Sequence, residues 1–281
     1  MEIARTVRQI SELLIRPSRP MALVPTMGAL HEGHLSLIEQ ARKSASTVVV
    51  SIFVNPKQFS PTEDLESYPR DLEFDLELLQ KNGVDLVFCP DITDMYPDGF
   101  ATSIQLEGPA LPLEGKLRPG HFHGVSTVVA KLLILIAPDT AYFGQKDAQQ
   151  ISVIRRMVSD LNIPAQIVVC PTLREKDGLA MSSRNSYLSS SQRLASSIMY
   201  RALQETFLRY QSGERRRKVL ENLCRRMLET EPSLDKIDYV EIVDPETFMN
   251  AESLLGDASA TLVIAAYFGS ARLIDNCVLN T

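Results

Sequence analysis

Short apolar runs alternate with amphipathic segments along the first 175 residues of the chain. The apolar runs have the length and composition of parallel strands that are buried on both faces. The segments between them repeat their apolar residues at the spacing of a helix. Such an alternation, with short connections, predicts a parallel sheet with helices on both of its faces. The strands are expected at 21–25, 47–54, 84–89, 140–143 and 166–171, and the helices at 33–44, 65–82, 125–136 and 148–161.

The pattern changes after about residue 174, where a polar, turn-rich segment is followed by two long helical stretches and three apolar runs. We therefore expect an α/β protein, with a Rossmann-like parallel sheet in a domain of residues 1–175 and a smaller α+β domain of residues 176–281. The helices of the second domain are expected at 191–211 and 213–231, and its strands at 237–243, 261–268 and 272–278.

The N-terminal segment and the cysteines indicate a soluble protein of the cytoplasm. Residues 1–20 carry apolar side chains at helical spacing, which predicts an amphipathic helix without the apolar core of a signal peptide. The most apolar stretch, 132–137, is too short to span a bilayer. The four cysteines lie far apart without any C-x-x-C pair, as expected of isolated thiols in a reducing compartment.

The charge balance limits the kind of ligand that the chain can bind. Its 281 residues include 29 Lys and Arg against 35 Asp and Glu, for a net charge of −6. This balance argues against extended contact with nucleic acid, which needs a basic face, but it allows a local positive pocket for a small anion. The most basic segment, 215–218, has Glu214 and Glu221 near it. We interpret it as a solvated helix face in preference to a nucleic-acid patch.

All four histidines lie in two short clusters beside glycine, at 31–34 and 121–124. The first cluster, His31-Glu32-Gly33-His34, follows a predicted strand and a glycine turn, and a predicted helix begins just behind it. A helix N-terminus offers unpaired backbone N–H groups and a positive partial charge to an anion. Two imidazoles at this place suit the charge that develops on phosphate oxygens during displacement at phosphorus.

The usual nucleotide-binding loops do not occur in the sequence. It contains neither a G-x-x-x-x-G-K-[ST] loop nor a G-x-G-x-x-G after a strand. The H-x-G-H motif that remains resembles the signature of the nucleotidylyltransferase and class I aminoacyl-tRNA synthetase superfamily, in which this motif holds the phosphates of ATP.

Five segments in order resemble the motifs of the pantoate–β-alanine ligase family, and the resemblance covers the chain from about residue 1 to its end. One departure is Gln145, where many members of the family carry glutamate. The difference weakens the case for a function of this side chain but not for a contact of its backbone with nucleotide. The segments are VPTMGALHEGH at 24–34, VSIFVNPKQF at 50–59 with its continuation to residue 70, GKLRPGHFHGV at 115–125, FGQKDAQQ at 143–150 and DGLAMSSRN at 177–185.

The resemblance implies an ATP-dependent, AMP-forming ligase of coenzyme A synthesis. ATP and (R)-pantoate would give pantoyl adenylate and pyrophosphate, and β-alanine would then displace AMP to form pantothenate. Such chemistry needs no enzyme nucleophile, because AMP is the leaving group of the mixed anhydride. The resemblance also implies Mg²⁺ beside ATP, a homodimer, and a C-terminal domain that closes over the active site.

The same resemblance implies four catalytic residues, which are His34, its helper His31, Lys146 and Arg184. His34 would stabilise the pentavalent α-phosphate, and the two cations would bind the phosphates. The implied ATP-binding residues are Met27, Gly28, Ala29, Leu30, His31, Glu32, Gly33, His34, Gly144, Gln145, Lys146, Asp147, Leu173, Met181, Ser182, Ser183 and Arg184.

Neutral amides are implied for the other substrates. Gln58 and Gln150 would bind the hydroxyls and the carboxylate of pantoate, and Gln58 would also lie near β-alanine. Asn55 is implied as a further ribose or substrate contact. Arg118 is either a substrate-facing group or only a cation of its loop, and Asp64 is a candidate ligand of Mg²⁺.

Three other functions stay open at this point. A nucleotidyltransferase that releases an adenylylated small molecule shares H-x-G-H but gives no reason for the paired glutamines. An RNA-binding module has little support in a chain with 10 Phe, 8 Tyr, no Trp and no basic stripe. A zinc hydrolase would use His121 and His123, but no further ligand set accompanies them, which favours a structural function for both.

Overall fold

The computed structural model describes residues 1–15, 17–61, 63–251, 254 and 259–279, and the chain forms two compact units. The first unit comprises Met1–Gly144 and Val153–Pro171, and the second comprises Gln145–Ser152 and Thr172–Thr281. The short segment Gln145–Ser152 thus belongs to the second unit, although it precedes the residue at which the sequence pattern changes. Each unit has a sheet of its own.

The first unit contains a six-stranded parallel sheet in the order β1-β4-β3-β2-β5-β6, which confirms the predicted α/β fold. Val24 lies opposite Val50 and Thr26 opposite Ile52, so β2 and β3 end at the same edge. The strand order reverses between β2 and β5, and open α/β sheets bind ligands outside the carboxyl ends of the strands at such a point. The strands are β1 (Glu2–Ala4), β2 (Met21–Thr26), β3 (Thr47–Ile52), β4 (Leu86–Phe88), β5 (Thr140–Gly144) and β6 (Gln166–Cys170).

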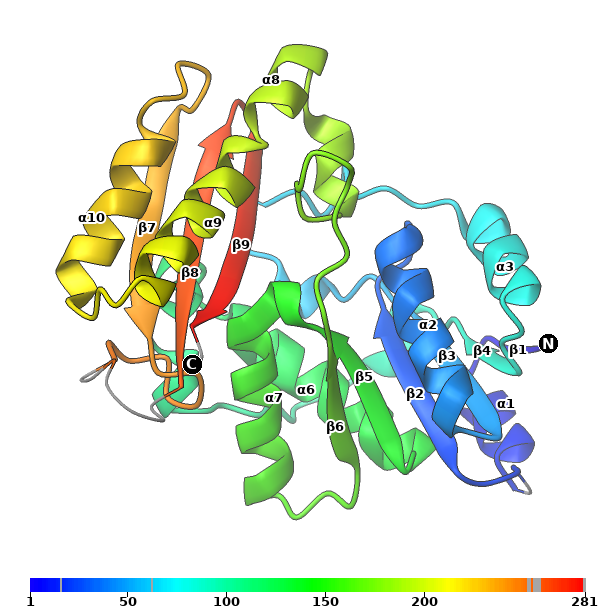
Figure 1. Ribbon diagram of the computed structural model, residues 1–281. Coiled ribbons are helices and arrows are strands. Elements are labelled where there is room, and N and C mark those ends of the chain that lie inside the picture. The colour runs from blue at the N-terminus through cyan, green and yellow to red at the C-terminus, as the bar shows by residue number, and fades with distance from the viewer. Residues whose placement is uncertain (16, 62, 252–253, 255–258, 280–281) are drawn as a thin grey trace. The chain divides into compact units, whose positions relative to one another are not determined.

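Helices flank this sheet, and both α2 and α6 contact the central strand β2 (Figure 1). α2 buries Leu37, Ile38 and Ala41 among the valines of β2 and β3, so the apolar stripe of the helix covers the apolar face of the strands. The helices are α1 (Val7–Leu13), α2 (Glu32–Ser44), α3 (Leu72–Lys81), α4 (Ile92–Met95), α5 (Glu114–Leu117), α6 (His121–Ile136) and α7 (Ala148–Asp160), with the 3₁₀ helices η1 (Pro56–Gln58) and η2 (Gly108–Ala110).

The N-terminal segment forms a strand before its helix, whereas the sequence pattern predicts a helix alone. Glu2–Ala4 pair in parallel with Leu86–Phe88 at the edge of the sheet. α1 begins only at Val7, behind a Thr6 side chain that accepts the backbone N–H of Gln9. Three residues are too few for an alternating pattern to show, and their pairing partner is distant in the chain, so this strand could not be predicted.

Two predicted helices of the first unit begin at other residues. The helix predicted at 65–82 begins at Leu72, because the Asp71 side chain caps it by accepting the N–H of Phe74. The helix predicted at 125–136 begins earlier, at His121, directly after the left-handed Gly120. His121 and His123 are therefore helical and not part of a loop.

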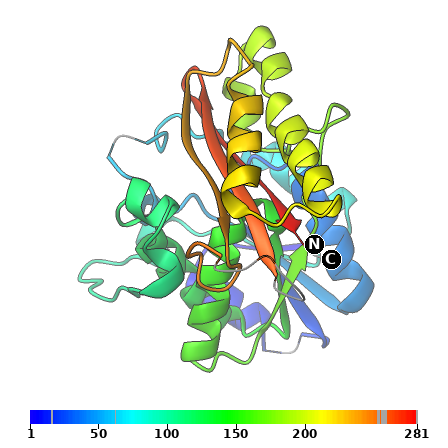
Figure 2. The same ribbon diagram turned by 60° about the vertical axis from the view of Figure 1, so that its left-hand side comes forward.

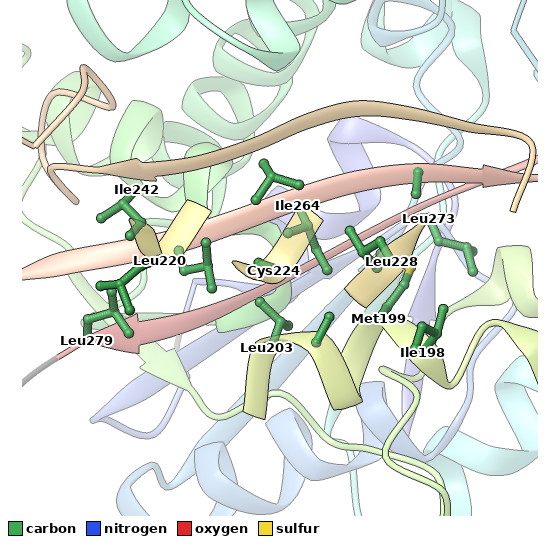
Figure 3. Packing of buried hydrophobic residues seen from close by; sticks show 14 of the residues in the cluster. Ile198, Met199, Leu203, Leu220, Cys224, Leu228, Ile242, Ile264, Leu273 and Leu279 are labelled. Carbon is green, nitrogen blue, oxygen red and sulfur yellow. The ribbon is translucent and has the colours of Figure 1, made fainter. Parts of the chain in front are cut away.

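The second unit is a three-stranded antiparallel sheet with α9 and α10 side by side against one of its faces (Figure 2). Met199, Leu203, Leu220 and Ile264 belong to the core between these layers (Figure 3). The predicted α+β module is confirmed, but the helix predicted at 191–211 is divided in two. The elements are η3 (Gln145–Asp147), η4 (Ser183–Tyr187), α8 (Ser190–Ala195), α9 (Ile198–Gln211), α10 (Arg217–Leu228), β7 (Lys236–Val243), β8 (Ala260–Phe268) and β9 (Ala271–Leu279).

Acids balance the basic run at 215–218. Arg216 pairs with Glu214 at 2.7 Å, and Lys218 pairs with Glu221 at 2.7 Å. The helix predicted at 213–231 begins only at Arg217, so Arg215 and Arg216 precede it and only the second half of the run lies on a helix face. The ion pairs leave little charge for a polyanion. Among the described residues, no helix is both long enough and apolar enough to cross a membrane.

Candidate active site

A strained turn leads from the end of β2 to the first histidine cluster. Gly28 and Ala29 have positive φ angles of 78° and 50°. Glycine adopts this conformation freely, whereas for alanine it costs roughly 1 kcal/mol. A Cβ added at Gly28 would lie 2.9 Å from Oδ2 of Asp75, so the turn also lacks room for a side chain there. The surrounding structure must therefore stabilise this turn.

Asp75 of α3 provides that stabilisation. Its Oδ2 accepts the N–H of Ala29 at 2.9 Å and its Oδ1 accepts the N–H of Leu30 at 2.8 Å, while only 1% of the residue is exposed. Burial raises the pKa of this carboxyl, although the two N–H groups act in the opposite direction. Asp75 lies outside every motif identified in the sequence. Its place on the apolar stripe of α3, between Leu72 and Leu79 at helical spacing, was the available signal.

The two histidines of the motif lie together at the N-terminus of α2. His31 is the N-cap residue, and its Nδ1 accepts the N–H of Gly33 at 3.1 Å. Nδ1 of His34 accepts the backbone N–H of His31 at 3.3 Å, and the ring centroids are 4.2 Å apart. Because Nδ1 is the acceptor in both rings, Nε2 is the nitrogen that carries the proton. The predicted pair is thus assembled as two N–H donors beside the helix N-terminus.

Asn55 and Gln58 lie together after the end of β3. The amide nitrogen of Asn55 donates to Oε1 of Gln58 and to the carbonyl of Gly124, both at 3.1 Å. Its oxygen accepts from the N–H of Lys57 at 3.3 Å and from the hydroxyl of Tyr96 at 2.7 Å. Protein groups therefore occupy all the hydrogen-bonding positions of Asn55, and a direct contact with substrate would require one of these bonds to be exchanged.

Gln58 links this group to the turn that precedes the histidines. Its Nε2 is 3.0 Å from Sδ of Met27, and the residue is 8% exposed. Thioether sulfur is a weak acceptor, so a stronger acceptor can replace it at little cost. Of the predicted pantoate ligands, Gln58 thus lies near the motif at the switch point of the first unit, whereas Gln150 lies in the first turn of α7, in the second unit.

Arg118 is held by acids and by a histidine of the same unit. Its Nε and Nη2 donate to both carboxylate oxygens of Glu63 at 2.8 and 2.7 Å, and Glu114 lies 3.6 Å away. Its Nη1 is 3.1 Å from Nε2 of His121, whose Nδ1 is 2.8 Å from the carbonyl of Gln58. A substrate carboxylate would have to compete with Glu63, so the geometry favours the interpretation of Arg118 as a cation of its loop.

His121 is a structural histidine with a fixed tautomer. Only a protonated Nδ1 can donate to the carbonyl of Gln58, and only an unprotonated Nε2 can accept from Arg118. Burial, followed by the neighbouring charge of Arg118, lowers the pKa of His121 to about 4. The neutral ring thus joins the first turn of α6 to the main chain at Gln58.

In the second unit, Lys146 lies in the turn η3, with its side chain 20% exposed and its Nζ 3.6 Å from Oδ1 of Asp147. The Gln145 side chain donates to Oδ1 of Asn276 at 3.1 Å, so its amide is used within the protein. Gly144, the last residue of β5, belongs to the first unit, and a Cβ added there would meet nothing within 4 Å.

The predicted serines and arginine lie in and just before η4. Ser182 is the N-cap residue of this short helix, and its Oγ accepts the N–H of Arg184 at 3.3 Å. A hairpin precedes it, in which the N–H of Met181 donates to the carbonyl of Leu173 at 3.0 Å. Ser183 and Arg184 follow as the first residues of η4, so the second unit gathers these phosphate-binding candidates in one segment.

The metal candidate Asp64 lies in a turn after η1, next to Glu63. Within the described part of the chain, no group of three or more His, Cys, Asp or Glu could hold a metal ion. Mg²⁺ commonly binds through one or two carboxylates together with substrate phosphates, so a single aspartate is chemically suited to it.

Comparisons with known proteins give one consistent result. Residues 2–278 match the family model described as pantoate-beta-alanine ligase. The chain is 50% identical over 279 residues to the pantothenate synthetase of Roseiflexus sp. strain RS-1, covering 99% of both chains. Its structure resembles pantothenate synthetase from Thermus thermophilus, with a TM-score of 0.95, 46% identity and full coverage of both chains. It also resembles pantoate-beta-alanine ligase from Francisella tularensis complexed with beta-gamma ATP and beta-alanine, with a TM-score of 0.82, 36% identity and coverage of 100% and 98%.

Proposed function

The chain belongs to the pantoate–β-alanine ligase family, and from that premise we propose that it condenses (R)-pantoate with β-alanine to form pantothenate, AMP and pyrophosphate. The observation that carries this proposal is the match to the family over residues 2–278. The complex of the Francisella tularensis homologue with beta-gamma ATP and beta-alanine supports ATP and β-alanine as substrates.

The first step activates the carboxylate of pantoate. A carboxylate oxygen attacks the α-phosphorus of ATP, the bond from that phosphorus to the bridging oxygen breaks, and pyrophosphate leaves with the electron pair. Negative charge grows on the α-phosphate oxygens during this displacement. Catalysis therefore depends on the position of the reactants and on groups that stabilise that charge.

In the first unit, His34 and His31 are the residues that we assign to this charge. Both rings carry their proton on Nε2, because Nδ1 accepts a backbone N–H in each. They lie at the N-terminus of α2, where the helix dipole adds positive potential. Asp75 stabilises the turn before them, so the donors are preorganised and need little rearrangement when the charge develops.

In the second unit, Lys146 and Arg184 are the cations that we assign to the phosphates, with the hydroxyls of Ser182 and Ser183 as further donors. The Lys146 side chain is only 20% exposed, and its partner Asp147 is 3.6 Å away, beyond hydrogen-bond distance. A phosphate oxygen can therefore become its closest anionic partner.

The second step forms the amide. The unprotonated amine of β-alanine attacks the acyl carbon of pantoyl adenylate, the bond from that carbon to the phosphate oxygen breaks so that AMP leaves with the electron pair, and the nitrogen loses one proton to solvent. Gln58 and Gln150 are assigned to the hydroxyls and carboxyl group of pantoate, because neutral amides can both donate and accept hydrogen bonds. The amide of Gln58 contacts Asn55 and the weak acceptor of Met27, so its orientation is set before substrate binds.

We propose Asp64 as the protein ligand of the Mg²⁺ that accompanies ATP. The divalent cation would neutralise part of the triphosphate charge when bound. We also propose that the chain works as a homodimer in the cytoplasm. The family resemblance supports these assignments, and the molar mass in light scattering tests the homodimer.

Incubation of the purified protein with ATP, Mg²⁺, pantoate and β-alanine tests the function. We expect AMP and pantothenate to form in equal amounts, and pyrophosphate release to require pantoate. AMP formation that ignores pantoate would refute the proposal. An adenylylated product that accumulates unchanged in the presence of β-alanine would instead identify a nucleotidyltransferase.

A further inference from the structure

Two neighbouring polar residues of β9, Asp275 and Asn276, are buried although they lie outside every motif identified in the sequence. They are 3% and 4% exposed. As neighbours on a strand, they point to opposite faces of the three-stranded sheet. Buried polar side chains are retained where hydrogen bonds satisfy them, so the partners of these two residues indicate what they do.

Asn276 binds the turn that carries Lys146. Its amide nitrogen donates to the carbonyl of Gln145 at 2.9 Å and to that of Lys146 at 3.0 Å. Its oxygen accepts from Nε2 of Gln145 at 3.1 Å. One side chain thus fixes the main chain on both sides of the Cα atom of Lys146.

Asp275 binds the hairpin that precedes η4. Its two oxygens accept from Nη1 and Nη2 of Arg174 at 2.6 and 3.0 Å. Nη1 of Arg174 also donates to the carbonyl of Gly178 at 3.0 Å, and the guanidinium lies 4.5 Å from the ring centroid of Tyr200. Arg174 itself pairs with Ala180 in an antiparallel bridge. Asp275 therefore holds the hairpin of residues 173–181, which leads directly to Ser182.

We propose that Asp275 and Asn276 are positioning residues for the phosphate-binding cations, with Asn276 fixing the turn of Lys146 and Asp275 fixing, through Arg174, the hairpin before Arg184. The inference rests on the proposed function, in which these two cations bind ATP. A cation stabilises a transition state only when its position is fixed, and a displacement of about 1 Å can cost a hundredfold in rate.

The same sheet offers a matched control. Asp238 of β7 has a side chain that is 3% exposed, and it pairs with Arg272 and Lys236, each at 2.7 Å. Its side chain is about as buried as that of Asp275 and also pairs with an arginine. Its partners Arg272 and Lys236, however, belong to β9 and β7 and not to the turn or the hairpin. Asp238→Asn should therefore lower stability without moving either phosphate-binding segment.

The test compares Asn276→Ala, Asp275→Asn and Asp238→Asn with the wild type. Circular dichroism melting first sets a temperature at which all four proteins are folded. At that temperature we measure kcat, the KM values for ATP and β-alanine, and the Kd of a β,γ-non-hydrolysable ATP analogue. We expect Asn276→Ala and Asp275→Asn each to raise the KM for ATP and the Kd of the analogue by about tenfold, because each variant loses buried hydrogen bonds that fix one phosphate-binding segment.

In Asp238→Asn, KM for ATP should stay within about twofold of the wild-type value even where the melting temperature falls, because KM does not depend on the amount of folded enzyme. Unchanged KM and Kd in both β9 variants would overturn the inference, as would an equal rise in Asp238→Asn. Pantothenate formation by the wild type tests the proposed function separately. If the wild type binds the analogue but makes no pantothenate, the function is wrong, and the comparison of Kd values still decides the inference.

Discussion

His121 makes the stability of the protein depend on pH in a way that can be calculated. Burial and the charge of Arg118 lower its pKa from 6.5 to about 4 in the folded protein. In the unfolded chain the pKa returns to its ordinary value. Between these two values the unfolded chain binds more protons than the folded protein, so the free energy of unfolding falls as the pH is lowered. The stabilisation is complete above pH 6.5 and is lost as the pH falls through the folded pKa.

The size of the effect follows from the two pKa values. Between pH 7 and pH 5, linkage predicts a loss of about 2 kcal/mol in the free energy of unfolding from this one residue. His121→Asn removes the titration but keeps a donor near the position of Nδ1. The variant should be less stable at pH 7, and its further loss on going to pH 5 should be smaller than that of the wild type by about 2 kcal/mol.

Urea denaturation followed by circular dichroism at pH 7 and pH 5 measures these differences. His123→Asn is the matched control, because His123 is exposed in the same turn of α6. We expect this control to keep the pH dependence of the wild type. If His121→Asn and the wild type lost equal stability over this interval, the argument from burial and from the fixed tautomer would be refuted.

Three further substitutions test the site and its support. His34→Ala should lower the rate of adenylate formation by about a hundredfold or more, with unchanged circular dichroism; turnover within a few-fold of the wild type would contradict its assigned function. Asp75→Asn should raise KM for ATP by about tenfold, because the new amide nitrogen would face a backbone N–H group. The control Asp71→Asn, at the exposed N-cap of α3, should leave KM for ATP unchanged. Gly124→Ala should lower the free energy of unfolding, measured by urea denaturation, by about 1–3 kcal/mol, because the new Cβ would lie 2.2 Å from a carbonyl oxygen of η1. The control is Gly144→Ala, where a Cβ would meet nothing within 4 Å. If both variants lost the same small amount of stability, this reasoning would be contradicted.

The strands of the first unit show where periodicity succeeds. β2 and β3 are buried along almost their whole length, and their apolar runs mark them within two residues of their observed ends. β1 has only three residues and one buried position, so its identity depends on pairing with β4. The start of α6 was missed for a related reason, because Gly120 and the histidines after it resemble a loop until the capping geometry is known.

In the candidate site, too, the features formed by contiguous residues could be predicted, and those that depend on distant contacts could not. His31 and His34 could be placed at a helix N-terminus, because the strand, the glycine turn and the motif are contiguous in the chain. The turn itself is stabilised by Asp75, whose partner lies more than 40 residues away. No local pattern predicts such a contact. Asn55 shows what a motif alone does not reveal, because all the hydrogen-bonding positions of its side chain are occupied by protein groups, and its contact with substrate stays a prediction.

The residues that hold the main chain of the candidate site share one physical property, which explains why they matter to the site. Asp75, His121 and Asn276 are polar side chains that are at most 8% exposed, and each binds the main chain of a segment that carries a candidate ligand. A buried polar group without its partner costs about 1–3 kcal/mol, so the partner segment is held where the hydrogen bonds are satisfied. Motifs therefore locate the groups that meet substrate, whereas buried polar residues with main-chain partners locate the groups that position them. Substitution of a buried polar residue that binds the main chain of the site should change KM for ATP, although no proposed ligand is removed.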